Sequence, residues 1–153
     1  MFKENDYVVY RNDVCLIKSI TTDYYKLSPV RDNSLIISLP LDSKNIRHVM
    51  SKLEATKLVE HIKDIDIIEI ESDRYLEQAY KNLLSSEDYD DLVKIIKTTY
   101  LRNKHRKDEK KKVGEIDEKY FELAENKLYD ELSISLNMTI DEIKDYIFNS
   151  VNN

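Results

Sequence analysis

The chain has 153 residues, of which 41% are hydrophobic and 35% are charged, and its formal net charge is −6. This composition is typical of soluble globular proteins and leaves room for one ordinary domain or two small ones. No apolar run approaches the roughly twenty residues that a membrane span needs, so we expect no membrane contact. The first residues include Lys3, Glu4 and Asp6 and no apolar segment, which argues against an export signal. Cys15 is the single cysteine and has no internal partner, so we expect a reduced, cytoplasmic protein.

The first fifty residues predict short β-strands separated by turn residues. Runs rich in Val, Ile, Leu and Tyr occupy residues 7–10, 14–20, 24–27, 35–39 and 45–49. Four or five strands at this spacing predict a small, strongly bent antiparallel sheet or a partly open barrel. Such a sheet has edges, and an exposed edge can accept a strand from another protein.

The rest of the chain predicts helices. Capping-box patterns at Ser51–Glu54 and at Thr139–Glu142 mark two helix starts. We expect helices over residues 51–62, 72–84, 89–103, 116–136 and 139–148, with an extended linker at 64–71 and a polar connection at 104–115. The sequence therefore predicts an α+β fold, with a β domain at residues 1–50 and a compact all-helical domain at residues 51–153.

Residues that could carry catalysis are scarce. The three histidines, His48, His61 and His105, are scattered and form no metal-ligand spacing. Cys15 lies in an expected strand, where a core position is the simpler interpretation. Gly114 is the only glycine, which excludes a glycine-rich phosphate loop. We therefore expect no enzyme activity, no metal and no cofactor.

Basic residues are concentrated in one segment. Nine Lys and Arg residues lie between Lys94 and Lys112, against Asp108 and Glu109, which gives this segment a charge of +7 and leaves −13 for the rest of the chain. One interpretation is a solvated connection between helices, and the other is a surface for nucleic acid. Helical spacing favours a shared face for the lysines at 94, 97 and 104.

A series of short motifs resembles a known family. Near the start the chain carries Phe2, Asp6, Val8-Val9-Tyr10, Val14, Tyr24-Tyr25-Lys26-Leu27, Leu39-Pro40-Leu41 and Ile46-Arg47. The helical part adds Leu84-Ser85-Ser86-Glu87-Asp88, the helix at residues 92–102, and Ala124, Leu128 and Glu131. In this order the motifs resemble the CarD/CdnL family of bacterial RNA polymerase-binding transcription regulators. The first module also resembles the polymerase-interaction domain of the transcription-repair coupling factor.

The resemblance implies a fold, partners and sites. It implies a Tudor-like, SH3-like bent sheet that binds the β-subunit lobe of RNA polymerase by pairing a strand, supplied by residues 35–39 or by residues 21–25. It implies that the helical domain contacts the backbone of promoter DNA and stabilises the open complex at transcription initiation. We expect a monomer. The implied polymerase-binding residues are Thr22, Tyr24, Leu35, Ile36, Ile37, Ser38, Leu39 and Pro40. The implied DNA-binding residues are Arg74, Lys94, Lys97, Arg102 and Lys104.

The chain also departs from the family pattern. Asn5, Arg11 and Asp13 stand where the family has glycine, proline and glycine. The family often carries a tryptophan that wedges against the minor groove, and this chain has no tryptophan. Tyr75 is the nearest aromatic residue, although we favour a core position for it. The missing tryptophan and the acidic net charge favour an alternative function, that of a polymerase- or protein-binding adaptor without direct DNA contact.

Overall fold

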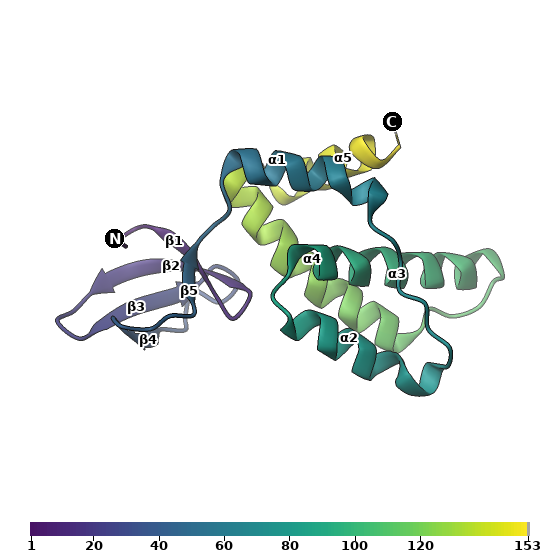
Figure 1. Cartoon of the computed structure of the whole chain (residues 1–153), viewed down its shortest axis with the longest axis horizontal. Helices are drawn as coiled ribbons and strands as arrows, with labels where there is room; N and C mark the ends of the chain where they lie inside the picture. Colours follow the sequence, from purple (N-terminus) through teal and green to yellow (C-terminus); the bar gives the residue numbers. More distant parts are fainter. Residues whose placement is uncertain (153) are drawn as a thin grey trace.

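The computed structural model describes residues 1–152 and confirms the α+β fold class. A curled antiparallel sheet at the N-terminus is followed by helices that fill the C-terminal part, and the two parts lie side by side (Figure 1). The strands are β1 (Tyr7–Tyr10), β2 (Asp13–Ile20), β3 (Tyr24–Pro29), β4 (Ile37–Pro40) and β5 (Ile46–His48), in the spatial order β4-β3-β2-β1-β5.

Two local features bend the sheet. Arg11 and Asn12 join β1 to β2 with φ angles of 52° and 67°. Positive φ at both central residues is the geometry of a type I′ turn, whose twist suits a two-residue hairpin. The β2–β3 register shifts between Ile17 and Ser19, and such a bulge increases local bending. The curled sheet encloses a core that includes Val8, Cys15, Ile17, Tyr25, Leu27, Leu39 and Ile46.

The fourth strand begins later than the sequence suggested. Residues 35–39 were expected to form it, but β4 covers Ile37–Pro40. Leu35 and Ile36 lie before the strand and are 47% and 52% exposed. Their apolar character favours a strand, but the sheet offers them no partner, because the register with β3 ends at the Leu27–Ile37 pair.

Helices form the rest of the described chain. They are α1 (Lys52–His61), α2 (Leu76–Ser85), α3 (Tyr89–Asp108), α4 (Glu115–Leu136) and α5 (Ile140–Val151), with short 3₁₀ turns η1 (Ile62–Asp64) and η2 (Asp73–Tyr75). Both predicted capping boxes are confirmed, at Ser51 and at Thr139. Within residues 1–152, no helix has the length and apolar content needed to cross a membrane.

Helix α3 is longer than expected. The sequence suggested an end near residue 103, yet α3 continues to Asp108. It ends in a Schellman arrangement, in which Lys111 N–H donates to the Arg106 carbonyl at 2.7 Å and Lys110 N–H to the Lys107 carbonyl at 3.0 Å. Lys110 holds the left-handed position with φ of 58°. The polar composition concealed this last turn, because charged residues at a solvated helix end resemble a loop in sequence.

The single glycine allows the Arg106 side chain to lie close to the backbone. Gly114 is the N-cap of α4 and its φ is −76°, which any residue can adopt. A Cβ atom at this position would lie only 2.6 Å from a guanidinium nitrogen of Arg106. The Gly114 N–H also donates to the Asn103 side-chain oxygen at 2.8 Å. Glycine here thus leaves room for the Arg106 guanidinium, which a Cβ atom would displace, and its backbone conformation does not call for glycine.

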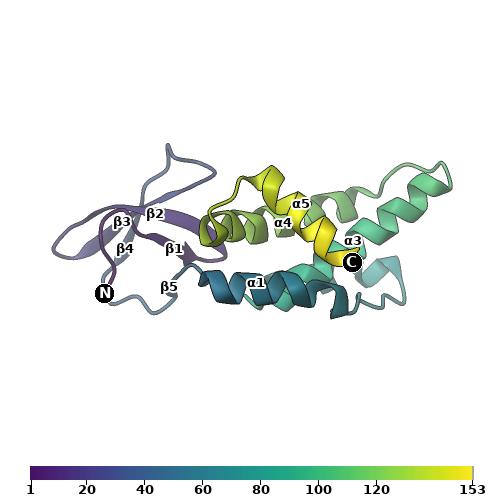
Figure 2. The same ribbon diagram turned by 90° about the horizontal axis from the view of Figure 1, so that it is seen from above.

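The buried side chains form two clusters, one in the sheet and one among the helices. Met50, which precedes the N-cap residue Ser51 of α1, belongs to the helical cluster. Figure 2 shows the sheet at one end of the elongated molecule and the α3–α4 connection at the other. Ion pairs between the two parts include Arg31–Asp130, Arg47–Glu131 and Lys127–Asp13.

A buried carboxylate joins the sheet to the helices. Glu131 of α4 is 3% exposed and receives both guanidinium NH₂ groups of Arg47 at 2.9 and 3.0 Å. It also accepts from the Met50 N–H at 2.7 Å and the Tyr89 hydroxyl at 2.6 Å. A second bidentate pair, Arg31 with Asp130, crosses the same junction but is more exposed. The neighbouring carboxylates of α4 thus hold β5 and the loop between β3 and β4.

We expect Glu131→Ala to destabilise the protein far more than Asp130→Ala. Removing Glu131 leaves the Met50 N–H and the Tyr89 hydroxyl without an acceptor, and the expected loss is on the order of 3 kcal/mol. The Arg31 guanidinium can return to water, so Asp130→Ala should cost about 1 kcal/mol or less. Urea unfolding at pH 7 measures both values. Equal losses would contradict the role assigned to Glu131.

Candidate functional site

On the outer edge of β4, one residue has both its backbone N–H and its C=O open to a partner. Leu41 N–H donates to the Asp23 carbonyl at 3.1 Å. This bond establishes which residues of β4 direct their backbone groups toward β3. Because bonded pairs alternate along an antiparallel ladder, Leu39 and Ile37 also face β3, and Ser38 faces away. Pro40 has no N–H, and its carbonyl accepts from Ser43 at 3.1 Å. Ser38 is therefore the residue of β4 whose N–H and C=O are both open to a partner strand.

Apolar side chains surround this edge. Leu35 and Ile36 precede β4, Leu41 follows it with 38% exposure, and Tyr24 at the start of β3 is 43% exposed. Ser38 lies beside Lys26, whose ammonium donates to the Ser38 hydroxyl at 2.6 Å. An open edge with exposed apolar neighbours is a hazard for aggregation unless a partner covers it.

Sheet order separates the two expected docking segments. Residues 35–39 include part of β4, an edge strand, whereas Tyr24 and Tyr25 belong to β3, which lies between β2 and β4. Thr22 lies in the exposed turn between β2 and β3. The sequence identified the apolar segment but not its position in the sheet, because strand order depends on long-range pairing.

Two of the five expected DNA-binding residues use their charged groups inside the protein. The Lys97 ammonium donates to the Ile62 carbonyl at 2.9 Å and also to the Ile65 carbonyl. It therefore ties the end of α1 and the following linker to α3. Arg102 donates to Asp117 at 3.0 Å and to Asp73 at 2.9 Å. Neither group is free to contact phosphate without losing these bonds.

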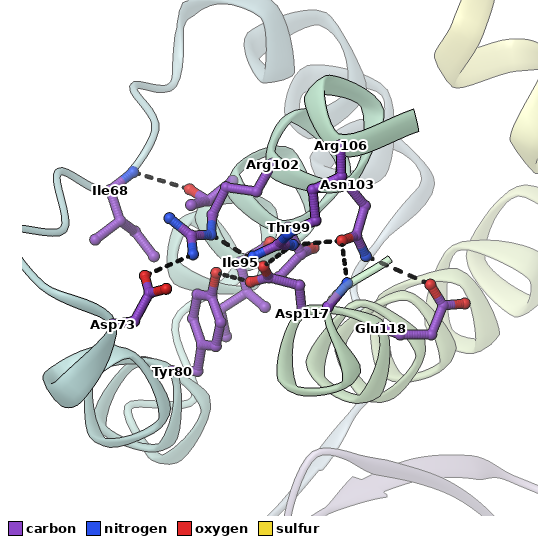
Figure 3. A network of polar contacts seen from close by, with 12 residues as sticks. Ile68, Asp73, Tyr80, Ile95, Thr99, Arg102, Asn103, Arg106, Asp117 and Glu118 are labelled. Carbon is purple, nitrogen blue, oxygen red and sulfur yellow. Dashed lines mark hydrogen bonds and ion pairs between the residues drawn. The ribbon is translucent and has the colours of Figure 1, made fainter. Parts of the chain in front are cut away.

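Arg102 is part of a buried polar centre around Asp117 (Figure 3). Asp117 is 1% exposed and accepts from the Tyr80 hydroxyl at 2.5 Å, Arg102 at 3.0 Å and Arg106 at 2.6 Å. Asn103 extends the network by accepting from Arg106 at 2.5 Å and from Gly114 at 2.8 Å. The network connects α2, α3 and α4, so these polar groups specify how the three helices pack.

This arrangement shifts two pKa values in opposite directions. Burial opposes ionisation of Asp117, but hydrogen bonds from Tyr80, Arg106 and Arg102 outweigh it and lower the Asp117 pKa. Burial raises the pKa of Tyr80, and its hydrogen bond to Asp117 raises it further. The centre is therefore a charged carboxylate held by two guanidinium groups and a neutral phenol, and its polar atoms are already satisfied within the protein.

The other three expected DNA-binding residues remain accessible but lie apart. Lys94 pairs with Asp91 at 3.8 Å across one helical turn, and Lys104 is exposed ten residues further along α3. That separation is about 15 Å along the helix and roughly 80° around it. Arg74 lies in η2, where its guanidinium is 5.6 Å from the Tyr75 ring centroid. The structure therefore does not bring the five predicted residues onto a single helix face.

The α3–α4 connection presents a denser positive surface, which we call the basic tip. It comprises exposed lysines on the last turns of α3 and just beyond, at the end of the molecule away from the sheet (Figures 1 and 2). Only one of them, Lys111, forms an ion pair in the described chain, with Glu109 at 3.0 Å. The sequence analysis counted this basic run and selected Lys104 from it, but its other choices on α3 lie further up the helix. The basic tip consists of Lys104, Lys107, Lys110, Lys111 and Lys112.

Tyr75 lies on the surface. The sequence interpretation favoured a core position, and this was wrong, because the Tyr75 side chain is 60% exposed. Tyr75 lies in the 3₁₀ turn before α2, and the buried residues of that helix are Leu76 and Tyr80 instead. Tyr75 and Arg74 thus form an exposed aromatic–cation pair at the start of α2.

Other reactive groups are isolated or buried. Within residues 1–152, no group of three or more His, Cys, Asp or Glu side chains is arranged to hold a metal ion. Cys15 is fully buried, and burial together with the nearby Asp13 raises the pKa of its thiol to about 11. A thiol with this pKa carries little thiolate at neutral pH, so Cys15 is a poor nucleophile.

Comparison with known proteins adds no identification. No family model matches the chain, and no curated protein matches it. The interpretation of the β4 edge and the basic tip therefore depends on their geometry and on the motif resemblance.

The pH dependence of stability should report on Asp117. Its lowered pKa in the folded protein stabilises that state above the unfolded-state pKa of about 4, and this contribution is lost as pH falls further. We expect Asp117→Asn to cost on the order of 3 kcal/mol at pH 7 and clearly less at pH 3. Urea unfolding at both pH values gives the comparison. Asp73→Asn is the control, since Asp73 is exposed, and a pH-independent loss in Asp117→Asn would contradict this account.

Proposed function

We propose that this protein is a transcription regulator that docks on the β-subunit lobe of RNA polymerase through the β4 edge and contacts promoter DNA through its helical part. The observation that carries the proposal is the open edge at Ser38, flanked by the exposed side chains of Leu35, Ile36 and Leu41. Strand addition uses backbone hydrogen bonds for affinity and flanking side chains for specificity, and this edge offers both.

The proposal for DNA contact is supported by the opposite end of the molecule. The Arg102–Asp73 ion pair joins η2, which carries Arg74 and Tyr75, to α3, whose last turns carry part of the basic tip. Lysine side chains at this spacing suit phosphate contacts, which carry no base specificity. Tyr75 offers an exposed aromatic ring near the place where the resembled family often has a tryptophan, and an apolar or aromatic side chain can act as a wedge against the minor groove. In the proposed mechanism, polymerase places the tip beside upstream DNA, and these contacts stabilise the open complex.

The second candidate is an adaptor that binds polymerase or another protein without DNA contact. It is favoured by the net charge of −6 and by the internal use of Lys97 and Arg102. Under this alternative the lysines of the basic tip stabilise the last turn of α3, because the partial negative charge at a helix C-terminus attracts cations. Lys110, Lys111 and Lys112 lie beyond that helix, so the helix dipole explains them less well.

We expect Ser38→Pro to abolish binding to the isolated β lobe of the cognate RNA polymerase. Proline removes the outward N–H of β4 and is tolerated on an edge strand whose N–H faces solvent. Ile37 is unsuitable for this test because its backbone faces β3. Titration calorimetry with the purified lobe measures the effect, and thermal unfolding verifies that the variant is folded.

The matched control is Ser38→Ala. It retains the backbone N–H and removes the hydroxyl that accepts from Lys26, so it should bind the lobe like the wild type. Undiminished binding by Ser38→Pro would exclude strand addition at β4. Absence of binding by the wild-type protein would overturn the polymerase proposal itself.

We expect the double variant Lys104→Glu/Lys107→Glu to shorten the lifetime of promoter open complexes while leaving β-lobe affinity unchanged. If three or four phosphates are contacted, the logarithm of the affinity should fall with the logarithm of salt concentration at a slope of roughly −3. Each lost contact should reduce that slope by about 0.9. Open-complex decay tests the lifetime, and titration of promoter-bound polymerase with the protein at several salt concentrations tests the slope.

Lys57→Glu/Lys63→Glu is the matched control, since both lysines are exposed and lie outside the basic tip. It makes the same change in net charge and should leave the salt dependence unaltered. Identical open-complex lifetimes for the wild type and the tip variant would favour the adaptor without DNA contact.

A further inference from the structure

A second group of basic side chains lies where the sheet meets the helices. An open groove with a volume of about 450 Å³ lies between α2 and α4, next to the β1–β2 turn. Arg11 from the turn, Lys81 from α2, and Lys119 and Lys127 from α4 line it. One carboxylate, that of Glu87, is among the lining residues. These cations come from three distant parts of the chain and are separate from the basic tip.

Two of these cations have no counter-ion within residues 1–152. In the described residues, neither Arg11 nor Lys81 takes part in an ion pair, and Arg11 instead lies 5.1 Å from the Tyr10 ring centroid. Lys127 is held by Asp13 at 2.8 Å and is 17% exposed, so its position is fixed. Lys119 is 3.7 Å from Glu77 and 60% exposed, which leaves it free to turn to a ligand. The uncompensated charge along the groove is therefore mainly positive.

The backbone around the groove is held in an unfavourable conformation. Arg11, Asn12 and Glu87 have φ angles of 52°, 67° and 62°. Left-handed backbone costs residues other than glycine roughly 1 kcal/mol or more, with asparagine the least affected. The Asn12 side chain donates to the Leu84 carbonyl at 3.0 Å and thereby fastens the β1–β2 turn to the end of α2. The turns that carry Arg11 and Glu87 are thus fixed against each other, and the groove is preformed.

The dimensions and lining favour a small ligand with more than one anionic group. Leu84, Leu123 and Tyr120 provide the apolar part of the lining. A volume of about 450 Å³ exceeds what one inorganic ion fills and lies within the usual range for small-molecule sites, ~300–1,000 Å³. Lys119 and Lys127 are eight residues apart on α4, or about 12 Å along the helix axis, which suits several phosphoryl groups in sequence. An arginine together with mobile lysines is the usual donor set for phosphate.

We propose that this groove binds a small molecule carrying two or more phosphoryl groups, with Arg11, Lys81 and Lys119 as its contacts. Lys127, anchored by Asp13, contributes fixed positive charge. Glu87 opposes binding and limits the affinity. The shared chemistry is a polyphosphate chain, which a nucleoside triphosphate or an inorganic polyphosphate can supply. This inference is independent of polymerase docking and of the basic tip.

The test is titration calorimetry of the full-length protein with inorganic tripolyphosphate, with ATP, and with a short single-stranded oligonucleotide, all without divalent metal. We expect tripolyphosphate or ATP to bind, and Lys81→Glu to weaken that binding at least about tenfold, or 1.4 kcal/mol. Glu87→Asn should tighten binding several-fold, because it removes the opposing charge and asparagine tolerates the left-handed backbone. Lys57→Glu makes the same charge change as Lys81→Glu on an exposed face of α1 and should leave the affinity unchanged.

The outcomes separate the ligand sources. Tighter binding of ATP than of tripolyphosphate supports a nucleotide site, and equal binding supports a site for the phosphate chain alone. No binding of either probe at millimolar concentration overturns the proposal. Equal weakening by Lys57→Glu and Lys81→Glu would also overturn it, since binding would then follow net charge only. Preferential binding of the oligonucleotide, lost in Lys81→Glu, would overturn it in favour of a nucleic-acid groove.

Discussion

The arrangement of the whole molecule depends on the carboxylate of Glu131. A sheet of this size cannot bury enough apolar surface to be independent of its neighbour, and the two apolar clusters of the protein remain separate. Glu131 compensates by accepting hydrogen bonds from Arg47, Met50 and Tyr89 at one buried point. These bonds have directions, whereas apolar contact does not, so the joint fixes how the sheet is oriented on the helices.

Polar contacts inside the protein also determine which basic side chains remain available at the surface. Composition alone suggests one basic surface on α3, but the helices need cations for their own packing. Lys97 satisfies carbonyl groups near the end of α1, and Arg102 and Arg106 neutralise the buried Asp117. What remains for partners is the basic tip beyond the packed part of α3 and the groove at the sheet–helix junction. Positive charge is thus available on side chains that the packing of the helices does not use.

Sequence patterns predicted the helices and strands better than the contacts between them. The alternation of apolar residues and the capping boxes at Ser51 and Thr139 are local signals, and the corresponding elements are present. The start of β4, the surface position of Tyr75 and the internal role of Arg102 depend on contacts between distant segments. The groove of Arg11, Lys81 and Lys119 carries no sequence signal at all, because its residues are far apart in the chain and none belongs to a motif.

The two proposed docking surfaces impose a geometric condition on each other. The β4 edge belongs to the sheet at one end, and the basic tip lies at the other (Figure 2). A partner held at β4 can position a second partner at the tip only if the joint between them is rigid. Arg47 and Arg31 reach neighbouring residues of α4 from different parts of the β domain, which resists rotation better than one contact does. Under the proposed function, the polar joint is therefore what lets a small sheet and a helical body act as one spacer between two partners.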